Sequence, residues 1–206
     1  MSATPSQQLY EEIEGAYDWF NEKLFDGQLP GCIFTLQRKA NTFGYFSPSR
    51  FLRRNGAGKS DEIALNCAYF AHRRIDQTLS TLAHEQVHQW QVHLGTPSRS
   101  GYHNREWANK MKAIGLMPSD TGEPGGKQCG QQMTHYIIDG GPFAVACQEL
   151  IDQGGMLSWI DVVTHRVAMS ATQLYGPDGK PVEQPLADPT IDILALTSAG
   201  LLTPAP

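Results

Sequence analysis

The chain has 206 residues, of which 40% are hydrophobic and 18% charged, so its composition is that of a globular protein and not of a disordered or fibrous one. Its net charge of -5 is modest, and no apolar run approaches the roughly 18 residues of a membrane span, which predicts no membrane partner. The N-terminal segment does not resemble an export signal and the four cysteines are scattered without a CxxC pair, so we expect a reduced, cytoplasmic protein.

The first third of the chain is typical of one helix followed by a small sheet. From about Gln7 to Phe25, apolar residues recur at helical spacing, namely Leu9, Ile13, Ala16, Tyr17 and Phe20. Residues 33–37, 42–46 and 62–66 are short β-branched or aromatic runs bounded by turn residues, which predicts a three-stranded sheet. Between the last two runs, residues 47–61 are polar and contain glycine, so we expect a long loop there.

Positive charge is concentrated in this part of the chain. Residues 31–75 carry eight basic residues against two acidic ones, whereas residues 1–30 and 116–206 are acidic. The bases that make this region a candidate for sequence-independent contacts with DNA phosphates are Arg50, Arg53, Arg54, Lys59, Arg73 and Arg74. The alternative interpretation is a solvated loop, since no pattern of interleaved basic and aromatic residues accompanies them.

The second part of the chain alternates helices with turn-rich segments. A helix is predicted from about Asp76 to Leu94 and another from about Asn104 to Ile114, each ended by a glycine. A glycine-rich loop over residues 121–131, a strand over 133–138 and a helix over 142–152 follow. Together these elements predict an α+β fold.

The C-terminal part carries weaker signals. Six prolines fall between residues 176 and 206, where little periodicity is present apart from residues 191–202. We therefore expect one main domain over residues 1–160 and a C-terminal extension of uncertain order over residues 161–206.

Residues 84–88 read His-Glu-Gln-Val-His, which is the HExxH pattern. Two histidines four apart on a helix differ by about 40° of rotation, so both imidazoles reach one ion. The apolar residues of the same helix form a separate stripe, made of Leu79, Leu82, Ala83, Val87, Trp90 and Leu94. One face of this helix is expected to pack while the other binds a metal.

A catalytic zinc ion usually takes three protein ligands and keeps a fourth position for water, so a third ligand is required. We choose His103, which follows a chain-reversing turn and begins the next helix on its inward face. Glu106 remains an alternative ligand, or else an acceptor for a hydrogen bond from a ligand imidazole. His93 falls beside the apolar stripe and suits a capping or packing role. The histidines without a partner at ligand spacing, interpreted as structural, are His72, His135 and His165.

These roles predict a hydrolytic mechanism. The ion lowers the pKa of its bound water to roughly 7, and Glu85 removes the proton as the water attacks a peptide carbonyl. An oxyanion donor is also expected, with Tyr102 and Tyr136 as candidates that the sequence does not distinguish.

The stretch LAHEQVHQW followed by GYHNREW resembles the SprT-like (Spartan-type) metallopeptidases, which pair HExxH with a later histidine in a GHxxEF-like element. Further similarity lies in LFDGQLP, NTFGYF and EIALN, so the resemblance covers about residues 9–117. It implies a zincin-like metallopeptidase fold in which a small sheet packs on the HExxH helix. It also implies a Zn2+ ion held by His84, His88 and His103, with Glu85 as the base.

The resemblance further implies proteolysis of DNA-associated proteins. The chain departs from many members in having only Cys129 and Cys147 after residue 116, so no cysteine zinc ribbon is predicted. It also has Tyr102 where the family tends to have glycine. The residues 125–143, which look like an extension found in some bacterial relatives, receive no catalytic role. A zinc-containing regulator that binds DNA or protein without cleaving it is the alternative function.

Overall fold

The computed structural model describes residues 3–71, 73–161, 163–164, 175–182 and 203–204. His72 and His165, both interpreted as structural from the sequence, lie outside these residues. The helices are α1 (Pro5–Phe25), α2 (Ile75–Leu94), α3 (Arg105–Ala113) and α4 (Pro142–Asp152), with a short 3-10 helix, η1 (Cys67–Tyr69). The strands are β1 (Ile33–Gln37), β2 (Gly44–Leu52), β3 (Lys59–Asn66), β4 (Leu116–Ser119), β5 (Thr134–Ile137), β6 (Val163–Thr164) and β7 (Thr203–Pro204). The predicted α+β class is confirmed.

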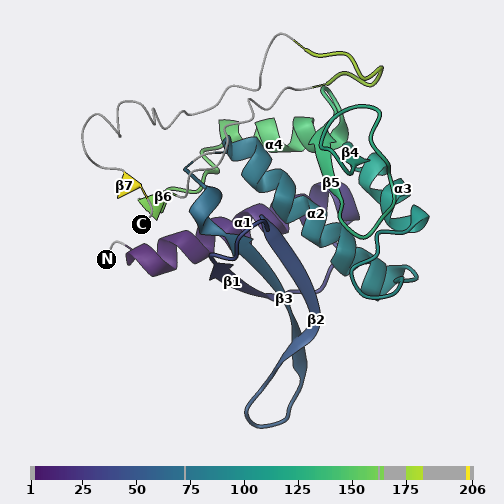
Figure 1. Ribbon diagram of the computed structural model, residues 1–206. Coiled ribbons are helices and arrows are strands. Elements are labelled where there is room, and N and C mark those ends of the chain that lie inside the picture. Colours follow the sequence, from purple (N-terminus) through teal and green to yellow (C-terminus); the bar gives the residue numbers. More distant parts are fainter. Residues whose placement is uncertain (1–2, 72, 162, 165–174, 183–202, 205–206) are drawn as a thin grey trace.

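The predicted three-stranded sheet is present, in the order β1-β3-β2. Strand β3 pairs in parallel with β1 and antiparallel with β2. The long loop predicted over residues 47–61 is wrong, because β2 continues to Leu52 and β3 begins at Lys59. These strands form a ribbon that extends beyond the helices at the bottom of Figure 1. Both faces of the projecting ribbon meet water, so its residues lack the apolar alternation that reveals a half-buried strand.

The first helix forms as its apolar pattern predicts. The Thr4 side chain accepts a hydrogen bond from the backbone N–H of Gln7 at the N-terminus of α1. Its inward face is buried, and Phe20 packs on Phe143 of α4 with ring centroids 5.2 Å apart. Lys23 of α1 also pairs with Glu149 of α4 at 2.9 Å. Helices α1 and α4 therefore lie against each other beside α2.

Helix α2 runs through the centre of the molecule, in contact with the sheet and with the other three helices (Figure 1). The sequence predicted one packed and one open face, but polar residues of α2 are buried as well. Gln86 donates from Nε2 to the backbone oxygen of Tyr17 at 3.0 Å, and the Tyr17 hydroxyl donates to Gln89 Oε1 at 2.7 Å. Each of these two buried amides thus has one hydrogen bond to α1, whereas Gln86 Oε1 has no partner in the described part of the chain. The metal-binding candidates on α2 therefore lie on an enclosed helix.

The segment after α3 forms a second, two-stranded sheet. Strand β5 was predicted, whereas its antiparallel partner β4 was not, because β4 has only four residues and contains Pro118. The predicted glycine-rich loop connects them. Strands β6 and β7 pair in parallel, but most of residues 161–206 lie outside the described part, so the division at residue 160 remains a prediction. Among the described helices, none is both long and apolar enough to cross a membrane.

Candidate metal centre

The structure brings together the three predicted histidines. His84 and His88 lie one turn apart on α2, and His103 immediately precedes Asn104, the N-cap of α3. One ring nitrogen from each histidine lies within 4.8 Å of those of the other two. His88 Nε2 and His103 Nε2 are 3.1 Å apart. Helices α2 and α3 therefore converge on one small site.

The backbone of the glycine-rich loop fixes the position of His103. His103 and Gly130 form a two-way bridge, in which the His103 N–H donates to the Gly130 oxygen at 2.8 Å and the Gly130 N–H donates back at 3.1 Å. The same oxygen lies 3.2 Å from His103 Nδ1. Because a carbonyl only accepts, Nδ1 carries the hydrogen and Nε2 presents its lone pair to the site.

A fourth histidine, His135 of β5, touches the site from outside the cluster. Its Nδ1 lies 3.0 Å from Nδ1 of His84, and its Nε2 lies 2.9 Å from the Ser80 hydroxyl. Residues 125–143, to which no catalytic role was assigned from the sequence, supply both Gly130 and His135 to the surroundings of the cluster. Sequence spacing gave no signal of it, since the contact depends on where β5 pairs with β4.

Trp107 of α3 forms the floor of the site. Its ring centroid lies 5.1 Å from that of His84, 5.5 Å from that of His88 and 4.3 Å from that of His103. Trp107 is fully buried, so one rigid indole supports all three imidazoles. Sequence reasoning placed Trp107 on the inward face of its helix without recognising this contact.

Burial keeps the three imidazoles uncharged. Desolvation lowers the pKa of His84 far below its ordinary value, and the neighbouring histidines act in the same direction. Desolvation and His103 lower the pKa of His88 to about 3, and desolvation also lowers the pKa of His103. At neutral pH the rings are therefore bases with free lone pairs, which is the form that binds a metal.

This donor set fits a tetrahedral zinc ion. Zinc–nitrogen bonds of about 2.0–2.1 Å place neighbouring ligand nitrogens about 3.3 Å apart in a tetrahedron, close to the 3.1 Å between His88 and His103. Three imidazoles also leave one coordination position open. We conclude that the cluster is able to hold a metal ion.

Glu85 lies between α2 and strand β2. A Cβ atom at Gly44 would lie 2.9 Å from both Ala64 O and Thr81 Cγ2, and 3.5 Å from Glu85 Oε1, so glycine allows β2 to approach α2 closely. Burial raises the pKa of Glu85 to about 8, and a hydrogen bond from the Phe46 backbone opposes that shift. The Glu85 carboxyl group is therefore buried away from water, and Glu85 directly follows His84 in the sequence.

The alternative ligands lie elsewhere. Glu106 Oε2 accepts hydrogen bonds from Gln91 Nε2 and from the Thr96 N–H, both at 2.8 Å, so it secures the turn between α2 and α3. The expectation that Glu106 accepts from a ligand imidazole is wrong, because its bonded partners in the described part are these two groups. His93 Nε2 lies 2.6 Å from Asp61 Oδ2, away from the cluster.

Neither candidate oxyanion donor touches the cluster through a described contact. The Tyr136 ring packs on Tyr175, with centroids 5.1 Å apart, and Tyr136 follows His135 in β5, so the two side chains leave opposite faces of the strand. Arg99 lies over the ring of Tyr102, 5.1 Å from its centroid. The role of each tyrosine in catalysis remains a prediction.

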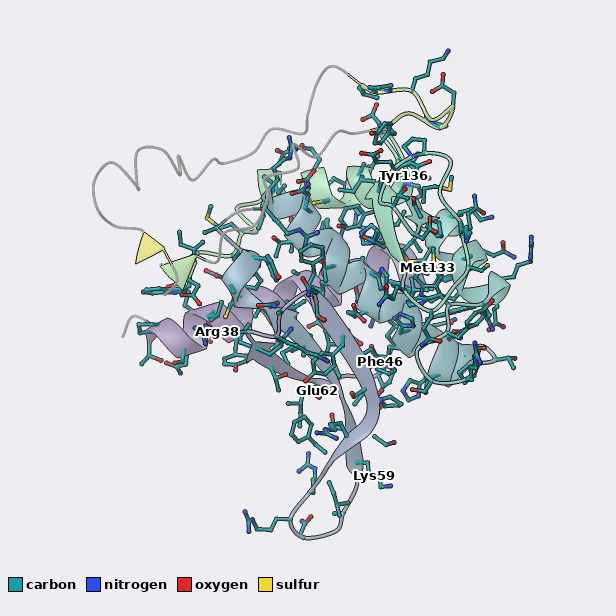
Figure 2. The ribbon with its side chains drawn as sticks, viewed as in Figure 1. Arg38, Phe46, Lys59, Glu62, Met133 and Tyr136 are labelled. Carbon is teal, nitrogen blue, oxygen red and sulfur yellow. The ribbon has the colours of Figure 1, made fainter. Side chains whose placement is uncertain are left out.

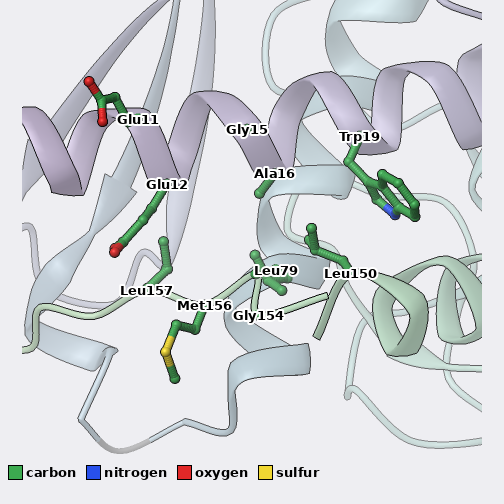
Figure 3. Close-up of a pocket in the computed structure, with 11 residues that line it drawn as sticks. Glu11, Glu12, Gly15, Ala16, Trp19, Leu79, Leu150, Gly154, Met156 and Leu157 are labelled. Carbon is green, nitrogen blue, oxygen red and sulfur yellow. The ribbon is translucent and has the colours of Figure 1, made fainter. Parts of the chain in front are cut away.

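A cavity of about 200 Å³ lies away from these histidines, between α1 and the segment that follows α4 (Figure 3). Its walls are mostly apolar and include Ala16, Trp19, Leu79, Leu150 and Met156. None of the converging histidines lines it, so the candidate chemistry is separate from this cavity.

Comparison with known proteins identifies the family. The SprT-like family model matches residues 13–135, which is more than half of the chain. The chain belongs to the SprT-like family. An uncharacterized protein in the mucB 3' region of Salmonella typhimurium is 49% identical over 59 residues, which cover 29% of this chain and 80% of that protein. No solved structure matches the chain.

The SprT-like match encloses the whole candidate centre. It begins at Ile13 in α1, includes His84, Glu85 and His103, and ends at His135 in β5. The resemblance drawn from the sequence motifs is therefore confirmed, and it extends beyond residue 117 to the strand that contacts His84.

Proposed function

We propose that this SprT-like protein is a zinc-dependent metallopeptidase with a zincin-like fold. His84, His88 and His103 hold one Zn2+ ion, and Glu85 is the general base. The observation that carries the proposal is the convergence of three imidazoles, two from α2 and one from the residue before the N-cap of α3, with the buried carboxyl group of Glu85 on α2. When bound in such a site, zinc polarises a carbonyl and acidifies water to a pKa of roughly 7.

Glu85 is suited to proton transfer. It is adjacent to His84 along α2, so it projects from a different side of the helix and is not a further ligand. Its raised pKa reflects a dry environment, and a cation placed in the cluster would favour its charged form. As the carboxylate it accepts a proton from the attacking water, and as the acid it returns that proton to the leaving amine.

We propose proteins as substrates, DNA-associated ones included, with the β2–β3 ribbon as the DNA contact. Figure 2 shows Lys59 far out along this ribbon, whereas Phe46 and Glu62 lie closer to the helices. Exposed bases on the ribbon are Arg50, Arg53, Arg54 and Lys59. Such a projecting basic ribbon is accessible to a phosphate backbone.

The other two predicted DNA contacts are engaged within the protein. Arg73 donates to Thr81 Oγ1 at 2.8 Å and to Gln77 O at 2.7 Å, and its guanidinium lies over the ring of Phe43. Arg74 pairs with Asp76 at 3.0 Å. The proposed DNA contact is accordingly confined to the ribbon.

The alternative is a regulator that keeps zinc and binds DNA or protein without cleaving it. The burial of Glu85 favours the enzyme, because a structural zinc site closes its fourth position and has no use for a base. We also propose that the protein works in the cytoplasm, since all four cysteines are free.

Cleavage of a DNA-binding protein, with and without its DNA, tests these proposals. The zinc-loaded chain is expected to cut the substrate, to cut faster when DNA is present, and to stop when a chelator removes the metal. Replacing Arg53 and Arg54 with alanine should remove the stimulation by DNA and leave the basal cleavage unchanged. The matched control replaces Lys127 and Lys180, two exposed bases away from the ribbon.

Each proposal fails on a different result. Absence of cleavage under both conditions would contradict the peptidase and favour the regulator. Equal cleavage with and without DNA would support the peptidase activity and contradict a role for DNA.

A further inference from the structure

We propose that His135 is a positioning residue that fixes the tautomer of His84 and thereby aims the Nε2 lone pair of His84 at the metal. This inference rests on the proposed metallopeptidase function, in which His84 is a ligand. It assigns a role to strand β5, which follows α2 and α3 in the chain. Three successive contacts fix the positions of the hydrogen atoms between α2, β5 and the cluster.

The chain begins at a group whose role is fixed. Ser80 Oγ lies 2.8 Å from the backbone oxygen of Gln77, one turn earlier on α2. A carbonyl oxygen only accepts, so the hydroxyl hydrogen of Ser80 points to Gln77. The opposite arrangement would leave two oxygens 2.8 Å apart with no hydrogen between them. The lone pairs of Ser80 therefore remain for its other neighbour.

That neighbour is His135, whose Nε2 is 2.9 Å from Ser80 Oγ. Since the hydroxyl has already used its hydrogen, Nε2 of His135 is the donor. The neutral imidazole carries one hydrogen, so its Nδ1 is a lone-pair acceptor. A charged imidazolium is disfavoured at this position, chiefly because burial removes the ring from water and further because the guanidinium of Arg73 lies near it.

The last contact, between His135 and His84, determines which nitrogen of His84 carries the hydrogen. His135 Nδ1 lies 3.0 Å from His84 Nδ1, and two acceptors do not pair, so His84 donates from Nδ1. Its remaining nitrogen, Nε2, is then unprotonated. Gly130 imposes the same tautomer on His103 through a backbone carbonyl. Two of the three imidazoles are thus prepared as ligands before any metal arrives.

The second effect is on orientation. The His84 ring packs against Trp107 and against His135, with ring centroids 5.1 and 5.2 Å away. Partners that fix the tautomer and the angle of a ligand imidazole are typically worth about 10- to 100-fold in metal affinity. His135 is expected to contribute in this range.

Nuclear magnetic resonance of the metal-free, ¹⁵N-labelled protein tests the tautomer without reference to zinc. We expect His84 to carry its ring hydrogen on Nδ1 and to be unprotonated at Nε2. A hydrogen on Nε2 of His84 would overturn the proposal. If the protein bound no zinc, the proposed function would fail, yet this spectrum would still decide the hydrogen-bonded chain.

Zinc affinity, measured by competition with a chelator, tests the consequence. His135→Phe keeps a ring but removes the acceptor, and should raise the zinc dissociation constant about 10- to 100-fold. His135→Asn offers an amide oxygen to His84 and should restore most of the affinity, which a purely space-filling role would not predict. Tyr136→Phe, on the opposite face of β5, is the matched control and should bind zinc like the parent.

The variants also distinguish the positioning role of His135 from the proposed metal binding. If the parent and His135→Phe bind zinc equally tightly, the positioning role is overturned while the metal centre stands. If His135→Phe does not fold, as judged by its unfolding transition, the tautomer of His84 in the spectrum of the parent decides. An affinity of His135→Asn as low as that of His135→Phe, with both variants folded, would contradict the proposal.

Discussion

The Glu85→Gln variant is expected to lose peptide hydrolysis by a factor of about 10² to 10⁴, the usual contribution of a general base. Glutamine has the same shape and fits the same buried position between α2 and β2, but it does not accept a proton from water. Because the metal ligands are unchanged, zinc content should remain that of the parent. The measurement is the initial rate of casein cleavage, with the metal content determined on the same samples.

The matched control is Glu106→Gln, which makes the same chemical change on the neighbouring helix. Its amide oxygen still accepts from Gln91 and Thr96, so cleavage should continue at close to the parent rate. A Glu85→Gln protein that cleaves as fast as the parent would show that Glu85 is not the base.

The Trp107→Ala variant is expected to lose about 3–5 kcal/mol of unfolding free energy, the range for removing a large buried aromatic side chain. The indole is fully buried and packs on all three imidazoles, so its loss leaves a cavity directly under the cluster. Denaturant unfolding with a chelator present measures this packing effect apart from metal binding.

Two further variants calibrate this result. Trp107→Phe keeps most of the ring and should cost clearly less than Trp107→Ala. Trp159→Ala removes an indole that is 44% exposed and should have the smallest effect of the three. A Trp107→Ala protein as stable as Trp159→Ala would contradict the role of Trp107 as the floor of the site.

The elements that the sequence predicts well are those whose signals are local. Strand β1 and helix α4 begin and end where their apolar runs and their bounding glycine and proline residues indicate. Helix α2 was located for the same reason, although the burial of its polar face was not foreseen. That burial depends on hydrogen bonds from α1, and residues so distant in sequence leave no periodic trace.

The projecting β2–β3 ribbon and strand β4 show the converse. The residues of the ribbon are polar, so composition favoured a loop there, and β4 is short and contains proline, so no strand was predicted for it. They form strands because each finds a partner: β2 pairs with β3, and β4 pairs with β5. Pairing between strands is a tertiary property, and an isolated segment does not reveal it.

In the candidate centre too, the sequence predicted some residues and missed others. His84 and His88 follow from helical spacing, and His103 follows from the turn that brings α3 back to α2. The contacts of Gly130 and His135 could not be predicted from residue spacing. Gly130 acts through its backbone carbonyl, which no sequence pattern reveals. His135 contacts His84 only because β5 pairs with β4. Glu106 was predicted to be an alternative ligand or an acceptor from a ligand imidazole, whereas its carboxylate accepts hydrogen bonds from Gln91 and from the turn.

Metal analysis of the purified parent beside His103→Ala is the most direct test of the central claim, that three imidazoles from two helical elements hold one cation. We expect about one zinc ion per chain in the parent and no zinc, or much weaker zinc binding, in the variant. Glu106→Gln, as the control, should retain its zinc. A parent without zinc, or a His103→Ala protein that binds zinc as tightly as the parent, would show that these three imidazoles do not hold a cation.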